Sequence, residues 1–445
     1  MKALLYLGLS VALLYTLVFA DSYKGPGRSR SHKDDHEKKG GRPHHEHHRR
    51  HHDHHHGRHH GRHHRHRHHY YLNETSACHK IAPGNAKFAF EFFKELAADH
   101  PSENIVFSPV SISTALALLS LGAKTNTHNQ IIEGIGFNTS ETPEKDIKEG
   151  FHHLQHMLND DESELSLESG NGLFISKTWT ILDQFIEEAK NVYDSETFSV
   201  DFQDNEEAKK LINTYVEEKT GGMIPEVLSS VAKNAALVLV NFIYFKGNWE
   251  SPFEEKWTEE DDFHVSDTET VKVPFMWKSD SFKMANLKDA TVVSLPYTGN
   301  ASALFILPSE GKLQEVEANL KDIVKKFRKV NWNENVDIFI PKFSVAGSLD
   351  LKDTLSKLGI TDVFTEEADL SGITGLPNLY ISKAIHKAKI TIDETGTEAA
   401  GSTVLEAMAM SLPPTVRFNR PFIFTIYSHS TRSFLFLAKI ANPSI

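Results

Sequence analysis

The pattern of apolar and polar positions predicts helices in the first part of the chain. Between Asn85 and Ala98 the apolar residues recur at intervals of three and four, which places them on one face of an amphipathic helix. Residues 108–123 (SPVSISTALALLSLGA) are apolar nearly all round, as expected for a buried helix. Residues 235–245 (AALVLVNFIYF) are apolar except for Asn241 and are typical of a central strand covered on both faces.

The last part of the chain has strand character. Two apolar runs, Phe422 to Ile426 and Ser433 to Ile440, flank the polar turn SHST and predict a β-hairpin. No Pro/Gly/Ser-rich linker and no internal repeat divides residues 71–445. We therefore expect one large α+β domain over residues 71–445.

Three polar residues lie in apolar surroundings: Ser108, Ser111 and Asn241. A buried polar group without a partner costs about 1 to 3 kcal/mol, so each of them needs hydrogen bonds. On the residues alone, local capping is the simpler interpretation.

The segment GTEAAGSTVLEAMAMSLPP (396–414) alternates with a period of two. One face carries Thr397, Ala399, Gly401 and Thr403 and has no charge, whereas Glu398 and the other glutamate share the opposite face. The small side chains suit a strand that could enter an existing sheet, and the two prolines at 413 and 414 end the strand character. The alternative is a flexible surface loop with accidental alternation.

The N-terminus predicts a secreted protein. Residues 1–20 (MKALLYLGLSVALLYTLVFA) have the charge and apolar stretch of a signal peptide, and no other segment is apolar for long enough to span a membrane. The sequons at Asn73, Asn138 and Asn300 predict a glycoprotein. The single cysteine, Cys78, permits no internal disulfide and is either a free thiol or half of a mixed disulfide.

Residues 21–70 form a His/Arg-rich extension, which we call the arm. Between positions 21 and 69 it holds 18 of the 27 histidines, with 13 Lys plus Arg against 6 Asp plus Glu, whereas the whole chain has a formal charge of −12. It has almost no apolar residues from which to build a core, so we expect it to be disordered. The sequence thus predicts a basic arm on an acidic body.

Known catalytic motifs are missing from the sequence. There is no G-x-S-x-G elbow, P-loop, G-x-G-x-x-G or paired C-x-x-C, and the string HEHHR at 45–49 ends in Arg where a zinc protease motif needs His. We expect that the protein is not an enzyme.

Five motifs spread over the body resemble the serpins, most closely the α1-antitrypsin-like group. They are NIVFSPVSISTALALLSLGAKTNTHNQIIEGIGFN (104–138), NFIYFKGNWESPF (241–253), LPYTGNASALFILPSEGKL (295–313), ISKAIHKAKITIDETGTEAAG (381–401) and VRFNRPFIFTIYSHSTRSFLFLAKIANPSI (416–445). The resemblance implies the serpin fold, with three β-sheets, about nine helices and an exposed reactive-centre loop at about 394–414. It also implies suicide inhibition of serine proteases.

In the family pattern the residue before the cleaved bond is the seventeenth when the glutamate that begins the hinge is counted as the first, which implies the bond Met410-Ser411 here. The implied hinge consists of Glu394, Gly396, Thr397, Glu398, Ala399, Ala400, Gly401, Ser402 and Thr403. Small hinge residues match inhibitory members. Met410 suits an apolar primary pocket, so the expected target resembles elastase, chymotrypsin or cathepsin G. The loop has Ala409 where the group commonly has Pro.

Further positions follow from the resemblance. Ser108, Ser111, Asn241 and His386 match the shutter beneath the central sheet, and Trp249 matches the breach at its top. Glu394 and Lys312 match a hinge ion pair, which contributes roughly 0 to 1 kcal/mol if exposed.

The arm suggests two further activities. Divalent Cu, Ni or Zn would bind neutral imidazoles, with no cofactor required by the body; the candidate ligands are His44, His45, His47, His48, His51, His52, His54, His55, His56, His59, His60, His63 and His64. Heparin or another glycosaminoglycan would bind arginines; the candidates are Arg49, Arg50, Arg58, Arg62, Arg65 and Arg67. A solvated tail without function is the remaining alternative.

The partners predicted from the sequence are a target serine protease and a glycosaminoglycan, with no nucleic acid, and the protein is expected to be a monomer. The alternative function is a non-inhibitory serpin that acts as a carrier, store or metal/heparin-binding protein.

Overall fold

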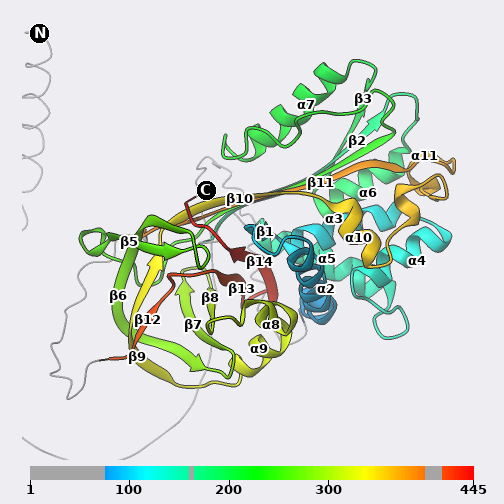
Figure 1. The fold of residues 1–445 in the computed structure, drawn as a ribbon. Helices are drawn as coiled ribbons and strands as arrows, with labels where there is room; N and C mark the ends of the chain where they lie inside the picture. Colours follow the sequence, from blue (N-terminus) through cyan, green and yellow to red (C-terminus); the bar gives the residue numbers. More distant parts are fainter. Residues whose placement is uncertain (1–75, 160–164, 396–412, 445) are drawn as a thin grey trace, which may run out of the picture. The chain divides into compact units, whose positions relative to one another are not determined.

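The computed structural model describes residues 76–159, 165–395 and 413–444, apart from the side chain of Ser166 (Figure 1). In these ranges the α-helices are α2 (Ala77–Asp99), α3 (Pro109–Gly122), α4 (Thr125–Gly134), α5 (Glu144–Leu158), α6 (Asp183–Tyr193), α7 (Asn205–Lys219), α8 (Leu313–Ala318), α9 (Leu320–Phe327), α10 (Leu351–Lys357) and α11 (Ser371–Thr374), with 3-10 helices at Glu255–Trp257 (η1) and Asp362–Phe364 (η2). The strands are β1 (Ile105–Phe107), β2 (Ser166–Ser176), β3 (Glu196–Val200), β4 (Leu237–Lys246), β5 (Glu259–His264), β6 (Thr270–Asn286), β7 (Ala290–Tyr297), β8 (Ala301–Pro308), β9 (Asn333–Pro341), β10 (Phe343–Asp350), β11 (Ile381–Ile392), β12 (Thr415–Arg417), β13 (Phe422–Ser428) and β14 (Ser433–Ile440).

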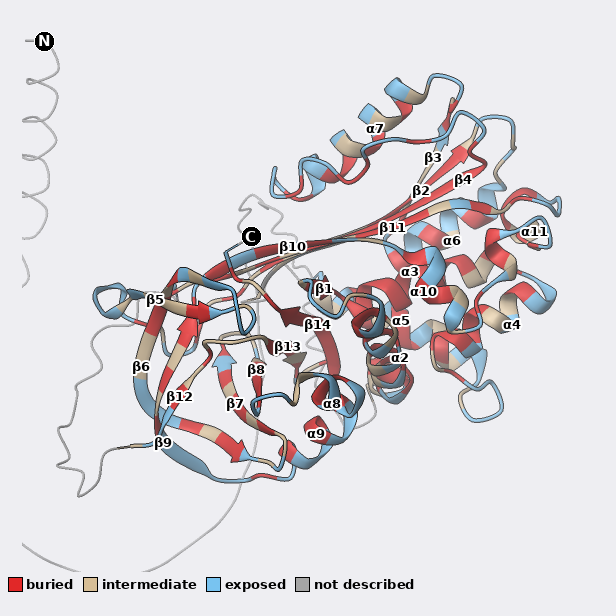
Figure 2. Cartoon of the chain, in the orientation of Figure 1, coloured by how far each residue is buried: buried red, intermediate tan, exposed pale blue. Residues whose placement is uncertain are grey.

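A five-stranded sheet, ordered β10-β11-β4-β2-β3, is the central layer. Helix α7 covers one face, and α3 and α6 lie on the other (Figure 1). The strand β4 is buried on both faces, because its side chains alternate between the two sides. Val238, Val240 and Phe242 pack in the cluster under α7, whereas Leu239 and Ile243 belong to the main core. Figure 2 shows β4 coloured mostly as buried.

Hydrogen bonding joins the other strands into one nine-stranded sheet, where the resemblance implies two further sheets. The 17-residue strand β6 causes this junction, because it pairs with β5 along its first part, with β9 along its middle and with β7 near its end. The part of the chain that the structure describes therefore has two hydrogen-bonded sheets and ten α-helices. The α+β class expected from the sequence is confirmed.

The elements with the clearest patterns are confirmed. The buried helix predicted over 108–123 is α3, the central strand predicted over 235–245 is β4, and the C-terminal hairpin is β13–β14. The helix predicted to begin at Asn85 begins at Ala77, with Pro83 inside it. Its buried face starts at Cys78 and Ile81, so packing continues the helix despite the proline.

Candidate functional site

A row of polar side chains crosses three adjacent strands of the five-stranded sheet. Asn241 on β4 lies opposite Asn171 on β2 and beside His386 on β11 in the strand registers. The Asn241 side-chain amide donates to Asn171 Oδ1 at 2.7 Å and to Ser111 Oγ at 2.7 Å. Its Oδ1 accepts a hydrogen bond from His386 Nδ1. We call this row, with the start of α3 beneath it, the polar row.

The start of α3 closes the polar row from below. Ser108 is the N-cap of α3, and its hydroxyl accepts a hydrogen bond from the Ser111 backbone N–H at 3.2 Å. The Ser108 backbone N–H donates to His386 Nε2 at 3.0 Å. The structure therefore brings together Ser108, Ser111, Asn241 and His386, as the resemblance implies. Local capping and the network are both present, because Ser108 takes part in each.

These contacts fix the protonation state of His386. Its Nε2 accepts a hydrogen bond, so the proton is on Nδ1 and is donated to Asn241. His386 is fully buried, and this burial lowers its pKa to about 3. The ring is accordingly neutral at physiological pH.

A second group of contacts, which we call the clasp, holds the chain just after β11. The Glu394 carboxylate accepts hydrogen bonds from Lys342 Nζ at 2.7 Å and from Thr258 Oγ1 at 2.8 Å. Its side chain is only 6% exposed. Burial raises the pKa of Glu394, but the hydrogen bonds from Lys342 and Thr258 outweigh burial, and the pKa lies below its ordinary value.

The prediction of an ion pair between Glu394 and Lys312 is wrong, because the two residues have other partners. Lys312 lies before α8 and pairs with Glu315 at 2.7 Å, where both side chains are exposed. The hinge partner is Lys342, the residue between β9 and β10. Sequence reasoning also missed Thr258 and Asn171, although the asparagine between two glycines in residues 170–172 is an unusual polar residue inside a strand.

Trp249 completes the clasp. Its indole Nε1–H donates to the Asp393 carbonyl at 2.9 Å, and its ring stacks on Tyr297 with centroids 4.1 Å apart. The side chain is 2% exposed, so the indole both fills the core and binds the backbone at the end of β11. This agrees with the breach position that the resemblance implies.

The polar row crosses the pairing of β4 with β11, and the clasp holds the chain beyond the end of that pairing. These strands are parallel and pair directly from Leu237 to Phe245 on β4 and from Ile381 to Ile390 on β11. No described strand lies between them. A parallel pair is the less stable kind of ladder. The other parallel pair of this sheet, β2 with β3, lies at its edge, so the pairing of β4 with β11 is the joint inside the sheet at which another strand would be easiest to accept.

Several predicted residues lie outside the described part of the chain. They are Gly396, Thr397, Glu398, Ala399, Ala400, Gly401, Ser402, Thr403, Met410, Ser411, Asn73 and all the arm residues. The sequon residues Asn138 and Asn300 are both exposed, and Asn300 has a φ of 59° at the turn before β8. Cys78 is fully buried, and burial raises the pKa of its thiol to about 11, which agrees with an unreactive thiol.

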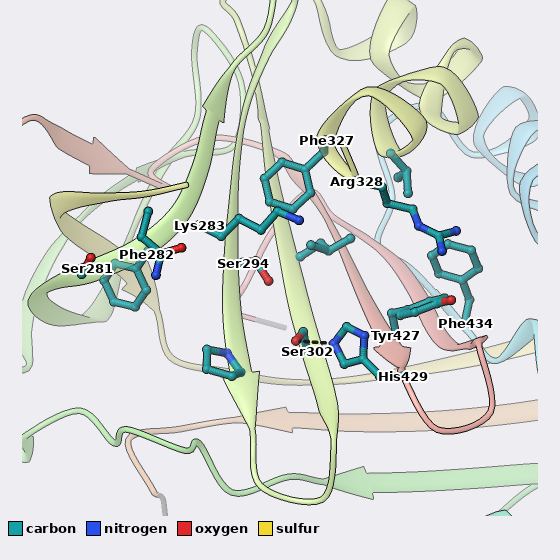
Figure 3. A pocket seen from close by; sticks show the side chains of 14 residues that line it. Ser281, Phe282, Lys283, Ser294, Ser302, Phe327, Arg328, Tyr427, His429 and Phe434 are labelled. Atoms are coloured by element: carbon teal, nitrogen blue, oxygen red, sulfur yellow. Dashed lines mark hydrogen bonds between the residues drawn. The ribbon is translucent and has the colours of Figure 1, made fainter. Parts of the chain in front are cut away.

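Away from the sheet, a cavity of about 480 Å³ opens between the β6–β8 strands, α9 and the β13–β14 turn (Figure 3). Its lining residues are Ser281, Phe282, Lys283, Ser294, Pro296, Ser302, Leu304, Val324, Phe327, Arg328, Asn333, Tyr427, His429 and Phe434. Lys283 lies 4.9 Å from the centre of the Phe327 ring, and Arg328 lies 5.3 Å from that of Tyr427. Burial, and then the nearby Arg328, lowers the pKa of Lys283. The cavity thus combines aromatic walls with two cations.

In the described residues no helix is long and apolar enough to cross a bilayer. The same part of the chain holds no group of three or more His, Cys, Asp or Glu side chains arranged to bind a metal.

The chain is similar to known proteins over most of its length. Residues 83–443 match the family model Serpin (serine protease inhibitor). The chain is 51% identical to alpha-1-antiproteinase of Callosciurus caniceps and 49% identical to that of Bos taurus, each over 375 residues that span 84% of this chain and 91% and 90% of those proteins.

Solved structures give the same result. Human glycosylated kallistatin is 41% identical with a TM-score of 0.77, covering 83% of this chain and 99% of kallistatin. Human thyroxine-binding globulin complexed with thyroxine is 40% identical with a TM-score of 0.77, covering 82% and 99%. The chain belongs to the serpin family.

Proposed function

We propose that the protein is a secreted suicide-type inhibitor of serine proteases, cleaved at Met410-Ser411, after which residues 396–410 enter the sheet between β4 and β11. The observation that carries this proposal is the direct parallel pairing of β4 with β11. A chain that folds back after β11 runs antiparallel to both strands, so one parallel ladder is exchanged for two antiparallel ladders.

Exchanging one parallel ladder for two antiparallel ladders should lower the free energy of the sheet. The present ladder has nine register pairs, and insertion of a full strand adds on the order of ten ladder hydrogen bonds at ~1 kcal/mol each. Residues 396–410 are about 50 Å long when extended, which is long enough to carry an attached protease along the sheet. The protein inhibits if insertion is faster than hydrolysis of the acyl-enzyme.

The polar row and the clasp hold the sheet until cleavage. The Asn241–His386 hydrogen bond joins the two strands that must separate, and the Glu394–Lys342 pair holds the segment that must move. Both are interactions that insertion breaks locally, so they set the barrier to insertion and keep the uncut protein from inserting.

Residue Met410 favours proteases with an apolar primary pocket, such as elastase, chymotrypsin or cathepsin G. Its side chain has no charge to pair with the carboxylate of a trypsin-like pocket. Oxidation of Met408 or Met410 to the sulfoxide makes the side chain polar and is expected to slow the inhibition.

The decisive experiment is complex formation with elastase or chymotrypsin on a denaturing gel. The expected product is an SDS-resistant complex, and cleavage at Met410 without a complex contradicts the proposal. Thr397→Arg puts a charge on the uncharged face and should convert the inhibitor into a substrate. Glu398→Arg is the matched control, because its face already carries charge, and it should still form the complex.

A second candidate function, a carrier of small molecules, is supported by the cavity lined by Lys283 and Arg328. Aromatic walls with two cations suit a flat apolar molecule with an anionic group, and a 40% identical serpin was solved with thyroxine. Equilibrium dialysis with thyroxine tests this function. Saturable binding that Arg328→Ala removes, together with no SDS-resistant complex, would favour the carrier over the inhibitor.

For the arm we propose glycosaminoglycan and divalent-metal binding, supported by its 18 histidines and 13 Lys plus Arg. Histidine protonation adds positive charge as the pH falls toward 6, so heparin retention should increase between pH 7.4 and pH 6. Deletion of residues 21–69 should abolish this retention and leave protease inhibition intact. Secretion and glycosylation at Asn73, Asn138 and Asn300 belong to the same proposal.

A further inference from the structure

The folded body carries a group of histidines of its own, separate from the arm. Three of them, His152, His153 and His156, lie on α5, and His79 lies in the first turn of α2, which packs against α5. Lys80 on α2 pairs with Asp146 on α5 at 2.9 Å, and Gly150 on α5 faces Ile81. The two helices thus bring the four imidazoles into one region.

The helix geometry pairs two of these histidines. His152 and His156 are four residues apart in an unbroken helix, and both are exposed. Residues at this spacing have Cβ atoms about 5–6 Å apart on the same face. Two imidazoles one turn apart can therefore approach a single ion from the same side of the helix.

The side chains of His152 and His156 have the chemistry of transition-metal ligands. Neutral imidazole is the form that ligates Cu²⁺, Ni²⁺ and Zn²⁺.

An unsatisfied nitrogen lies in the same region. His79 Nε2 is 2.8 Å from the Ser430 carbonyl, which can only accept, so Nε2 carries the proton. His79 Nδ1 then has a lone pair, and it is buried without a hydrogen-bond partner. Because this nitrogen is buried, it cannot reach an ion on the exposed face of α5, and His79 is not one of the proposed ligands.

We propose that His152 and His156 chelate one Cu²⁺, Ni²⁺ or Zn²⁺ ion on the surface of α5, at a site independent of the arm. The described residues contain no converged group of three ligands, so protein supplies two ligands and water completes the coordination. Affinity should follow the order Cu²⁺ above Ni²⁺, with imidazole ligands suiting both.

The test uses the full chain and follows thermal unfolding of the body with increasing NiCl₂. An ion bound to the folded α5 stabilises the folded state, because the two histidines lose their fixed spacing on unfolding. The variants are His152→Ala and His156→Ala, both at exposed positions. The control is His128→Ala on α4, a helical histidine with no histidine three or four residues away. The arm is the same in every variant, so its bound metal contributes equally.

Nickel should raise the unfolding midpoint of the wild type and of His128→Ala. In His152→Ala and His156→Ala the same rise should need at least tenfold more nickel. An equal rise in all four proteins, or none in the wild type, overturns the proposal. Isothermal titration should also show one fewer bound nickel ion in both variants than in the control, and equal numbers would contradict it.

Discussion

The clasp offers a sharp test of how the hinge is held, through the substitution Lys342→Ala. It removes the ammonium group 2.7 Å from Glu394 and leaves a carboxylate that is 6% exposed, with Thr258 as its remaining side-chain donor. The matched control is Lys312→Ala, which removes the same group from the exposed pair with Glu315.

The expected magnitude follows from burial. A hydrogen bond to a charged group contributes about 1.5–3 kcal/mol, and breaking a fully buried pair costs about 3–5 kcal/mol. The Lys342 side chain is itself 44% exposed, so in the variant water can partly replace its ammonium group beside Glu394. We therefore expect the free energy of unfolding to fall by about 2 kcal/mol. Without Lys342, burial dominates the pKa of Glu394 and should raise it. The Lys312→Ala control removes a lysine from a pair that is exposed on both sides and screened by water, so its loss of stability should be much smaller.

The assay is urea unfolding at pH 7, followed by tryptophan fluorescence, since Trp249 binds the backbone beside Glu394. The free-energy change is taken from the first transition, because a large protein need not unfold in two states. Equal losses in Lys342→Ala and Lys312→Ala would refute our account of the clasp.

Three further predictions concern the sheet. Burial lowers the pKa of His386 to about 3, so the free energy of unfolding should fall as the pH drops from about 6.5 toward 3, by up to ~1.4 kcal/mol per pH unit. In His386→Gln the urea midpoint should depend less steeply on pH than in the wild type, and an unchanged pH dependence contradicts the mechanism. Asn171→Ala should cost about 1 kcal/mol, because it removes the Oδ1 acceptor 2.7 Å from Asn241 Nδ2 and leaves that N–H the longer contacts to the Ser111 and Gly170 carbonyls, at 3.2 and 3.4 Å; an unchanged free energy of unfolding would exclude that role. Gly347→Ala would place a Cβ 2.0 Å from the Val106 carbonyl oxygen, so the variant should unfold at a clearly lower temperature in calorimetry. An unchanged unfolding midpoint would show that β10 and β1 can move apart at low cost.

Local patterns predicted the elements whose burial is strongest. The segments that became α3 and β4 have long apolar runs, so no nearby residue competes with the assignment. The start of α2 was missed because Pro83 is locally unfavourable in a helix, and only its packing against α5 and β14 shows why the helix continues through it.

The candidate site shows a different limit. Ser108, Asn241 and His386 could be named from motifs, but their hydrogen bonds depend on strand register. The partner of Glu394 depends on which lysine the fold brings near, and nothing local distinguishes Lys342 from Lys312. Long-range pairing of charges is set by the tertiary structure, so sequence reasoning gave the correct chemistry with the wrong residue.

The register of Asn241 with His386 also sets a requirement on any strand that comes between them. If the chain reverses over residues 393–396 and runs back antiparallel, Thr403 comes opposite His386. A hydroxyl there can accept from His386 Nδ1 and donate to Asn241 Oδ1, so one side chain replaces the bond that insertion breaks. The same alignment turns the uncharged face toward α3 and both glutamates outward. A reversal one residue longer or shorter would exchange the faces. The length of this turn therefore determines which face of an inserted strand would point toward α3: the uncharged face, or the face that carries the two glutamates.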